Sequence, residues 1–118
     1  MTLSPTITFQ GMEPSEALRT EVLRHISQLD RMASDLRSCR VLITAAERRH
    51  RHGNRYHVHV RVTLDGRELH AGRTPGRDDA HADPYLAVAD AFEALQRRLH
   101  EVLQRRRGDV KAHSQPSL

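Results

Sequence analysis

Histidine and arginine are the residues of this sequence whose number and arrangement indicate binding of metal ions or of anions. The 118-residue chain has 9 histidines, and all but one of its 19 basic Lys and Arg residues are arginine. The pairs His50-x-His52 and His57-x-His59 each place two imidazoles, which are common metal ligands, on one face of a strand. Zinc sites in small proteins usually add a thiolate or a carboxylate, and the one cysteine, Cys39, lies on an apolar alternation away from these histidines. We therefore expect no metal and no cofactor, and histidines that face solvent or an anionic partner.

Catalytic motifs are absent from the sequence. It contains no G-x-S-x-G or H-E-x-x-H motif, no P-loop and no glycine-rich dinucleotide turn. A Cys-His nucleophile pair would require Cys39 to be exposed. We predict that the chain is not an enzyme and has no small-molecule substrate.

The positive charge is concentrated in two parts of the chain. Residues 37–77 contain ten arginines and three acidic residues, and residues 97–111 contain six cations and two acidic residues. Codon bias in a GC-rich genome could explain arginine in place of lysine, but it does not explain this clustering. Clustered arginine is typical of proteins that bind a polyanion, because the planar guanidinium matches phosphate geometry.

Aromatic residues are too few to bind nucleic acid by stacking. The chain has 2 Phe, 2 Tyr and no Trp, and each of the four falls on an apolar stripe. Proteins that bind single-stranded RNA through its bases need exposed aromatic platforms. Recognition of backbone charge and shape is therefore favoured.

Apolar periodicity predicts six elements. Strands are expected at residues 6–10, 39–47, 56–64 and 67–73, each with alternating apolar residues. A helix should begin after an N-cap at Ser15, and a second after Asp83 and Pro84 with an apolar seam from Tyr85 to Leu103. We expect Gly108 to end this second helix.

The turn at residues 65–66 predicts how the strands at residues 56–64 and 67–73 pair with each other. Asp-Gly is the signal for a type I′ hairpin, and a two-residue turn sets Val62 opposite Leu69 and Arg61 opposite His70. The outer face of this hairpin should then be polar and basic.

These elements predict an α+β fold with the order β-α-β-β-β-α. The economical arrangement is one four-stranded sheet with both helices packed on one face, which leaves the other face, with His57, His59, Arg61 and His70, to water or to a partner. We expect residues 1–108 to form a single domain and residues 109–118 a flexible polar tail. The sequence shows no membrane span and no signal peptide, and its one cysteine agrees with a reducing compartment, so we expect a cytoplasmic protein.

The second helix carries the clearest candidate binding residues. Arg98 and Arg105 are seven residues apart and share one flank, Arg97 points outward, and Arg106 and Arg107 continue beyond the apolar seam. Such a set could bind phosphates bidentately. Alternatively, local pairs of Glu101 with Arg97 and Arg105 make an ordinary solvated face, although such pairing should absorb only one or two of the five cations.

The first helix and one loop add further basic residues. Arg24 and Arg31 lie opposite the core stripe of the first helix, where either solvent or a partner could meet them. The stretch between the second and third strands contributes possible additional RNA contacts at Arg48, Arg49, Arg51 and Arg55.

Several segments, taken together, resemble a known family. They are S-E-A-L-R at Ser15–Arg19, Leu29 near the end of the first helix, T-L-D-G-R-E-L-H-A at Thr63–Ala71 and D-P-Y-L-A-V at Asp83–Val88. Their order and spacing, over about residues 6–107, are similar to those of the bacterial ribosome hibernation-promoting and ribosome-associated inhibitor proteins, also called sigma-54 modulation proteins.

The resemblance implies a fold akin to double-stranded-RNA-binding domains with one added strand. It also implies a function in ribosome hibernation under stress or in stationary phase, with the 30S ribosomal subunit and 16S rRNA as partners. Family members bind in the small-subunit channel between head and body, over the mRNA and tRNA sites, and stop translation. The chain resembles the short form, which has no C-terminal dimerisation domain.

The family's basic positions can be placed on this chain. They fall at His25 and Gln28 of the first helix and at Ala94, Arg97, Glu101 and Arg105 of the second; Arg97 and Arg105 keep the charge, whereas Gln28, Ala94 and Glu101 do not. Together with the arginines found from the helix pattern, these positions give the expected set of rRNA-binding residues, which is Arg24, His25, Arg31, Arg97, Arg98, Arg105, Arg106 and Arg107. The alternative function is a regulatory protein-interaction module of the same fold, with a pH or metal response through His57, His59 and His70.

Overall fold

Six elements make up the fold. The computed structural model describes residues 3–47, 54–72 and 82–114. The elements are β1 (Pro5–Gln10), α1 (Glu16–Met32), β2 (Arg37–Glu47), β3 (Asn54–Leu64), β4 (Arg67–Ala71) and α2 (Pro84–Ser114). The predicted β-α-β-β-β-α order is confirmed. Two strands begin two residues earlier than expected, at Arg37 and Asn54, and the predicted end of the fourth strand at residue 73 lies outside the described residues.

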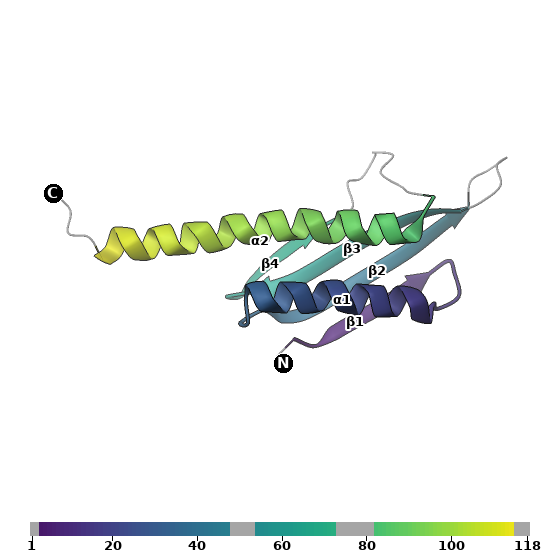
Figure 1. Cartoon of the computed structure of the whole chain (residues 1–118), viewed down its shortest axis with the longest axis horizontal. Helices are drawn as coiled ribbons and strands as arrows, with labels where there is room; N and C mark the ends of the chain where they lie inside the picture. Colours follow the sequence, from purple (N-terminus) through teal and green to yellow (C-terminus); the bar gives the residue numbers. More distant parts are fainter. Residues whose placement is uncertain (1–2, 48–53, 73–81, 115–118) are drawn as a thin grey trace.

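The strands form one mixed sheet in the order β1-β2-β3-β4. β1 and β2 pair in parallel because α1 connects them and returns the chain to the same end of the sheet (Figure 1). The other neighbouring strands are antiparallel.

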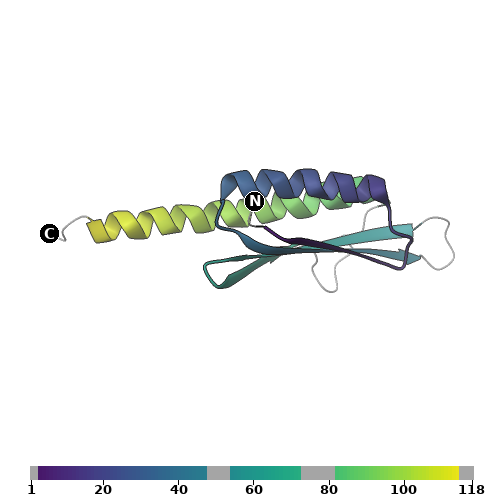
Figure 2. The ribbon, with the colours of Figure 1, turned by 90° about the horizontal axis from the view of Figure 1, so that it is seen from below.

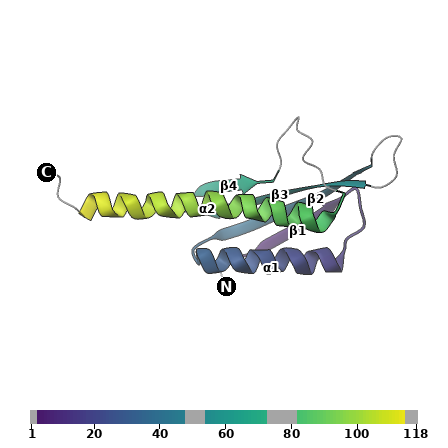
Figure 3. The same ribbon diagram turned by 45° about the horizontal axis from the view of Figure 1, so that its top comes forward.

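Both helices cover the same face of the sheet, as predicted (Figure 2). α2 lies over β3 and β4, and α1 lies beside α2 on the β1 side (Figure 3). Side chains from both layers meet in the core, and each fully buried aliphatic or aromatic side chain contributes about 1.5–3 kcal/mol relative to exposure. The largest of these side chains are Val22, Ile26, Leu29, Leu36, Val41, Ile43, Val58, Val60, Leu64, Phe92, Leu95 and Leu99.

Polar side chains cap the start of each helix. The Ser15 hydroxyl accepts a hydrogen bond from the Leu18 amide at 3.2 Å, and the Asp83 carboxylate accepts one from the Tyr85 amide at 2.8 Å. Both bonds satisfy amides that have no partner within the helix. The two predicted helix starts are confirmed.

The β3–β4 turn has the expected geometry. Asp65 has φ 53° and Gly66 has φ 73°, as a type I′ turn requires. The register pairs Val62 with Leu69 and Arg61 with His70, so the predicted register is confirmed.

Two predictions about α2 were wrong. The helix does not end at Gly108 but continues to Ser114, beyond the edge of the sheet (Figure 1). A glycine inside a helix costs only about 1 kcal/mol, and nothing at Gly108 imposes the left-handed backbone that stops a helix. Tyr85, expected on the apolar seam, is 44% exposed, because the buried face of α2 begins at Ala87 and Val88. The flexible tail at residues 109–118 stays a prediction.

Gly72 lies where β3 and α2 approach its backbone closely. Its φ is +108°, and a Cβ at this position would collide with the Val58 carbonyl oxygen and the Ala91 methyl group. Gly66 also has a positive φ, of +73°, but a Cβ added at Gly66 would have no atom within 4 Å.

We predict that Gly72→Ala destabilises the protein more than Gly66→Ala does. Gly66→Ala adds only backbone strain of about 1–2 kcal/mol, whereas Gly72→Ala adds strain and a collision, for a total above about 3 kcal/mol. Urea denaturation of both variants measures the difference. Equal losses of unfolding free energy would show that the close approach at Gly72 does not constrain the fold.

Candidate functional site

The arginines expected to bind RNA lie on the two helices. We call Arg24, Arg31, Arg97, Arg98, Arg105, Arg106 and Arg107 the helical arginines. All seven are at least partly exposed, but four of them form ion pairs with carboxylates of the same chain. Their availability to a phosphate therefore differs from residue to residue.

On α1, Arg24 is bound by Glu21. Its Nη2 lies 2.6 Å from Oε2 of Glu21, and its Nε lies 3.2 Å from Oε1. This two-pronged hydrogen bond lowers the pKa of Glu21 and raises the pKa of Arg24. Both carboxylate oxygens are thus already used, and a phosphate must displace Glu21 to bind Arg24 in the same way.

His25, the next predicted RNA contact, is largely covered. Its side chain is only 12% exposed, and its ring stacks on Phe92 of α2 with centroids 5.0 Å apart. Burial, reinforced by the neighbouring Arg24, lowers the pKa of His25, so the ring is uncharged at neutral pH. In this position the ring packs α1 against α2.

Two arginines of α2 form exposed pairs within the helix. Arg97 Nη1 lies 2.9 Å from Glu93 Oε1, and Arg105 Nη2 lies 3.7 Å from Glu101 Oε2. Both members of each pair are more than 60% exposed, so each pair contributes only a few tenths of a kcal/mol and a phosphate can displace the carboxylate. Glu101 pairs with Arg105 as the alternative reading expected, but Arg97 pairs with Glu93.

Arg106 links three parts of the fold. Its Nη1 lies 3.0 Å from Asp35, between α1 and β2, and 2.9 Å from Asp65 in the β3–β4 turn. The hydrogen bond from Arg106 lowers the pKa of Asp35 and, with the bond to Asp65, raises the pKa of Arg106. Local pairing thus occupies two cations of α2, Arg97 and Arg105, as expected, and the contacts of Arg106 with distant carboxylates occupy a third.

Three helical arginines have no such partner. Arg31, Arg98 and Arg107 are exposed and form no ion pair with any residue in ranges 3–47, 54–72 and 82–114. They are the helical cations most ready to meet an external anion.

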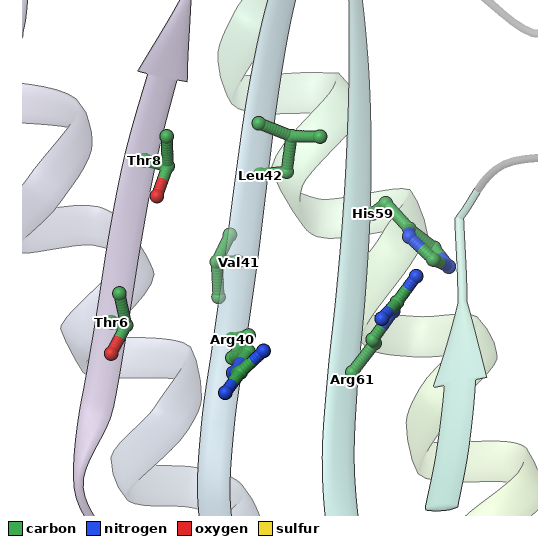
Figure 4. A pocket seen from close by; sticks show the side chains of 7 residues that line it. All are labelled: Thr6, Thr8, Arg40, Val41, Leu42, His59 and Arg61. Carbon is green, nitrogen blue, oxygen red and sulfur yellow. The ribbon is translucent and has the colours of Figure 1, made fainter.

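The opposite face of the sheet carries a second group of cations. We call it the open face; it consists of the outward side chains of the four strands. One row crosses all four strands, since Thr6 pairs with Arg40, Arg40 with Arg61, and Arg61 with His70. The side chains around Arg40 and Arg61 border a shallow hollow of about 400 Å³ (Figure 4).

The histidines of the open face form one contact. His59 Nε2 lies 3.4 Å from His70 Nδ1, and the two rings meet edge to face. The contact follows from the register, because His70 lies opposite Arg61 and His59 is two residues before Arg61 on the same face of β3. Within the described part of the chain, no group of three His, Cys, Asp or Glu residues is placed to hold a metal ion.

The remaining predicted residues divide into two groups. Arg48, Arg49 and Arg51, like His50 and His52, lie outside the described residues. Arg55 lies near the start of β3 and is half-buried.

Cys39 is buried in the core, and burial raises the pKa of its thiol to about 12. A thiol in this state is a poor nucleophile.

Sequence reasoning missed Arg40 and the acidic partners of Arg106. Arg40 follows from the alternation of β2, because Cys39 and Val41 point inward, but its place beside Arg61 depends on a register that no short turn fixes. Asp35 and Asp65 are 71 and 41 residues from Arg106 in the sequence, and no local pattern indicates such contacts.

Comparison with known families identifies the group to which the chain is related. Residues 6–107 match the model of the family described as sigma 54 modulation protein / S30EA ribosomal protein. The chain belongs to this family. The resemblance seen in the sequence is thereby confirmed.

Solved structures share the fold. The N-terminal domain of Protein Y from Thermus thermophilus superposes with a TM-score of 0.66 at 19% identity, covering 86% of this chain and 99% of that one. A ribosomal subunit interface protein from Coxiella burnetii gives a TM-score of 0.67 at 17% identity, covering 85% and 97%. No curated protein matches by sequence. In the described part of the chain, no helix has the length and hydropathy to span a bilayer.

We predict that the Arg106 contact stabilises the fold. A double-mutant cycle of Arg106→Ala and Asp35→Ala should give a small favourable coupling at pH 7, because the pair is partly exposed to solvent. Arg107→Ala, the matched control, should change stability by less than about 0.5 kcal/mol.

The same coupling should depend on pH. Asp35 has a lowered pKa in the folded state, so its contribution is present above the unfolded value of about 4 and is lost as the pH falls through the folded value. Urea denaturation at pH 7 and pH 3 measures both effects. A cycle with no coupling at pH 7 would contradict a structural role for Arg106.

Proposed function

We propose that this protein binds the small ribosomal subunit and blocks translation by occupying the mRNA and tRNA sites on 16S rRNA. The observation that carries the proposal is the family match over residues 6–107, in a family described as ribosomal. The fold supports it, since both structural neighbours share it and one of them is named a ribosomal subunit interface protein.

In this proposal the helical arginines bind rRNA phosphates. Arg31, Arg98 and Arg107 do so directly, and Arg97 and Arg105 exchange an exposed glutamate for a phosphate, with which guanidinium forms strong bidentate hydrogen bonds. Such contacts carry no sequence information and position the domain by charge and shape. The bulk of the domain then excludes mRNA and tRNA without any chemical reaction.

We also propose that Arg24, His25 and Arg106 contact rRNA. Each of them has an internal partner in this structure, so each must exchange that partner for RNA in order to contribute. Gln28, Ala94 and Glu101 supply no positive charge at positions where the resemblance implies it. We infer that the unpaired helical arginines contribute more to binding than these positions do.

The proposed ribosomal partner also indicates the compartment and the growth condition in which the protein acts. A protein that acts on 30S subunits works in the cytoplasm, and an occluding role suits periods of stress or stationary phase, when idle ribosomes are kept intact.

A second function is favoured by the contact between His59 and His70. Two imidazoles 3.4 Å apart on an exposed sheet are two candidate metal ligands, which suits a regulatory protein-interaction module. Titration with zinc in a calorimeter, with His70→Ala as the control, tests this alternative.

We predict that the protein pellets with 30S subunits and that its affinity falls steeply with salt. Each phosphate contact releases bound counterions, so the logarithm of the association constant should fall linearly with the logarithm of the salt concentration. Sedimentation at about 50 mM and about 200 mM KCl measures the slope. Absence of the protein from the pellet at the lower salt concentration counts against the proposed function.

Arg98→Glu should weaken this binding about tenfold or more, because a charged hydrogen bond is replaced by repulsion. Arg19→Glu is the matched control, since it makes the same change in net charge on α1, where Arg19 lies over the Phe9 ring. Equal weakening by both substitutions would mean that net charge, and not the position of Arg98 on α2, governs binding.

A further inference from the structure

The open face of the sheet has a charge pattern that the fold itself does not require. Among its described residues, three are arginines, Arg40, Arg55 and Arg61, and three are histidines, whereas Glu68 is the one acidic residue. Neither Arg40 nor Arg61 forms an ion pair with a described residue.

The placement of Arg40 and Arg61 is unfavourable for folding. They are direct cross-strand neighbours on β2 and β3, and His70 on β4 continues the row next to Arg61. Like charges directly opposite each other destabilise a sheet. Nothing in the described structure offsets this repulsion, so an external anion is the natural partner of the row.

The surroundings indicate which anion fits. Thr6, Thr8, Arg40 and Arg61 line the same shallow hollow, together with Val41, Leu42 and His59 (Figure 4). Hydroxyl groups and guanidinium groups are donors typical of contacts to phosphate oxygens. The described residues of this face include no Phe, Tyr or Trp, so the surface suits a sugar-phosphate backbone better than stacked bases.

We propose that the open face is a second phosphate-binding surface, on which Arg40 and Arg61 hold the backbone of an RNA segment. The choice of RNA as the anion rests on the proposed function. The helical arginines lie on the other side of the domain, so the protein binds RNA on two opposite faces and bridges two segments. Such a bridge suits a protein held between two parts of a folded RNA.

The test uses the full chain and two ligands, a fluorescent RNA hairpin of about 16 base pairs and 30S subunits. Arg40→Gln/Arg61→Gln should lower hairpin affinity at least tenfold and reduce the magnitude of the salt slope by about two, because two phosphate contacts are lost. The same variant should keep or raise the urea midpoint, because the repulsion between the strands is relieved. Weaker RNA binding together with equal or greater stability is a combination that a purely structural role does not produce.

The single variants provide a matched comparison. Arg61→Gln should weaken hairpin binding, whereas Arg19→Gln, with the same loss of charge away from the open face, should leave it within about twofold of the unchanged protein. Full affinity and an unchanged salt slope in the double variant would overturn the proposal. So would tighter binding of an acidic peptide, polyglutamate, through the same two arginines, since it would identify an acidic protein segment as the partner.

The two ligands separate the two proposals. If the unchanged protein binds the hairpin through Arg40 and Arg61 but does not pellet with 30S subunits, the open face binds RNA and the proposed function fails. In the opposite case, the unchanged protein pellets with 30S subunits, and the double variant matches it both in pelleting and in hairpin affinity. The proposed function then stands, and the open face is not an RNA surface.

Discussion

Burial of one face of the sheet under two helices is the constraint on which the rest of this structure depends. Alternation along β2 and β3 places Val41, Ile43, Val58, Val60 and Val62 against the helices, and every intervening side chain must then point the other way. A shift of one residue would exchange the two faces, so the apolar core fixes the register firmly. The row of Arg40, Arg61 and His70 on the open face is a direct consequence of this packing.

The same packing determines where the charged side chains of the two helices lie. The apolar stripes of α1 and α2 face the sheet, so their arginines lie at the outer surface, where glutamates one turn away can reach them. Exposed pairs of this kind are weak and are readily exchanged for phosphate. Arg106 differs because it contacts Asp35 and Asp65 on two other parts of the fold, so that its side chain connects α2 to the β3–β4 turn.

Local signals in the sequence were sufficient for most of the fold. The caps at Ser15 and Asp83 and the Asp65-Gly66 turn each depend on residues within a few positions, and all three appear in the structure as predicted. The end of α2 was missed because a glycine stops a helix only where the backbone turns left-handed, and the sequence does not reveal that choice. The site was harder to predict, since the partners of Arg106 and the neighbours of Arg40 come from distant parts of the chain.

We propose that cations on this domain bind the phosphates of small-subunit rRNA over the mRNA and tRNA sites. Chemical footprinting of 16S rRNA in 30S subunits, with and without saturating protein, tests it most directly. We predict that the bound protein protects rRNA backbone positions on both sides of the channel between head and body from the footprinting reagent. Unchanged reactivity of these positions at saturation would contradict it.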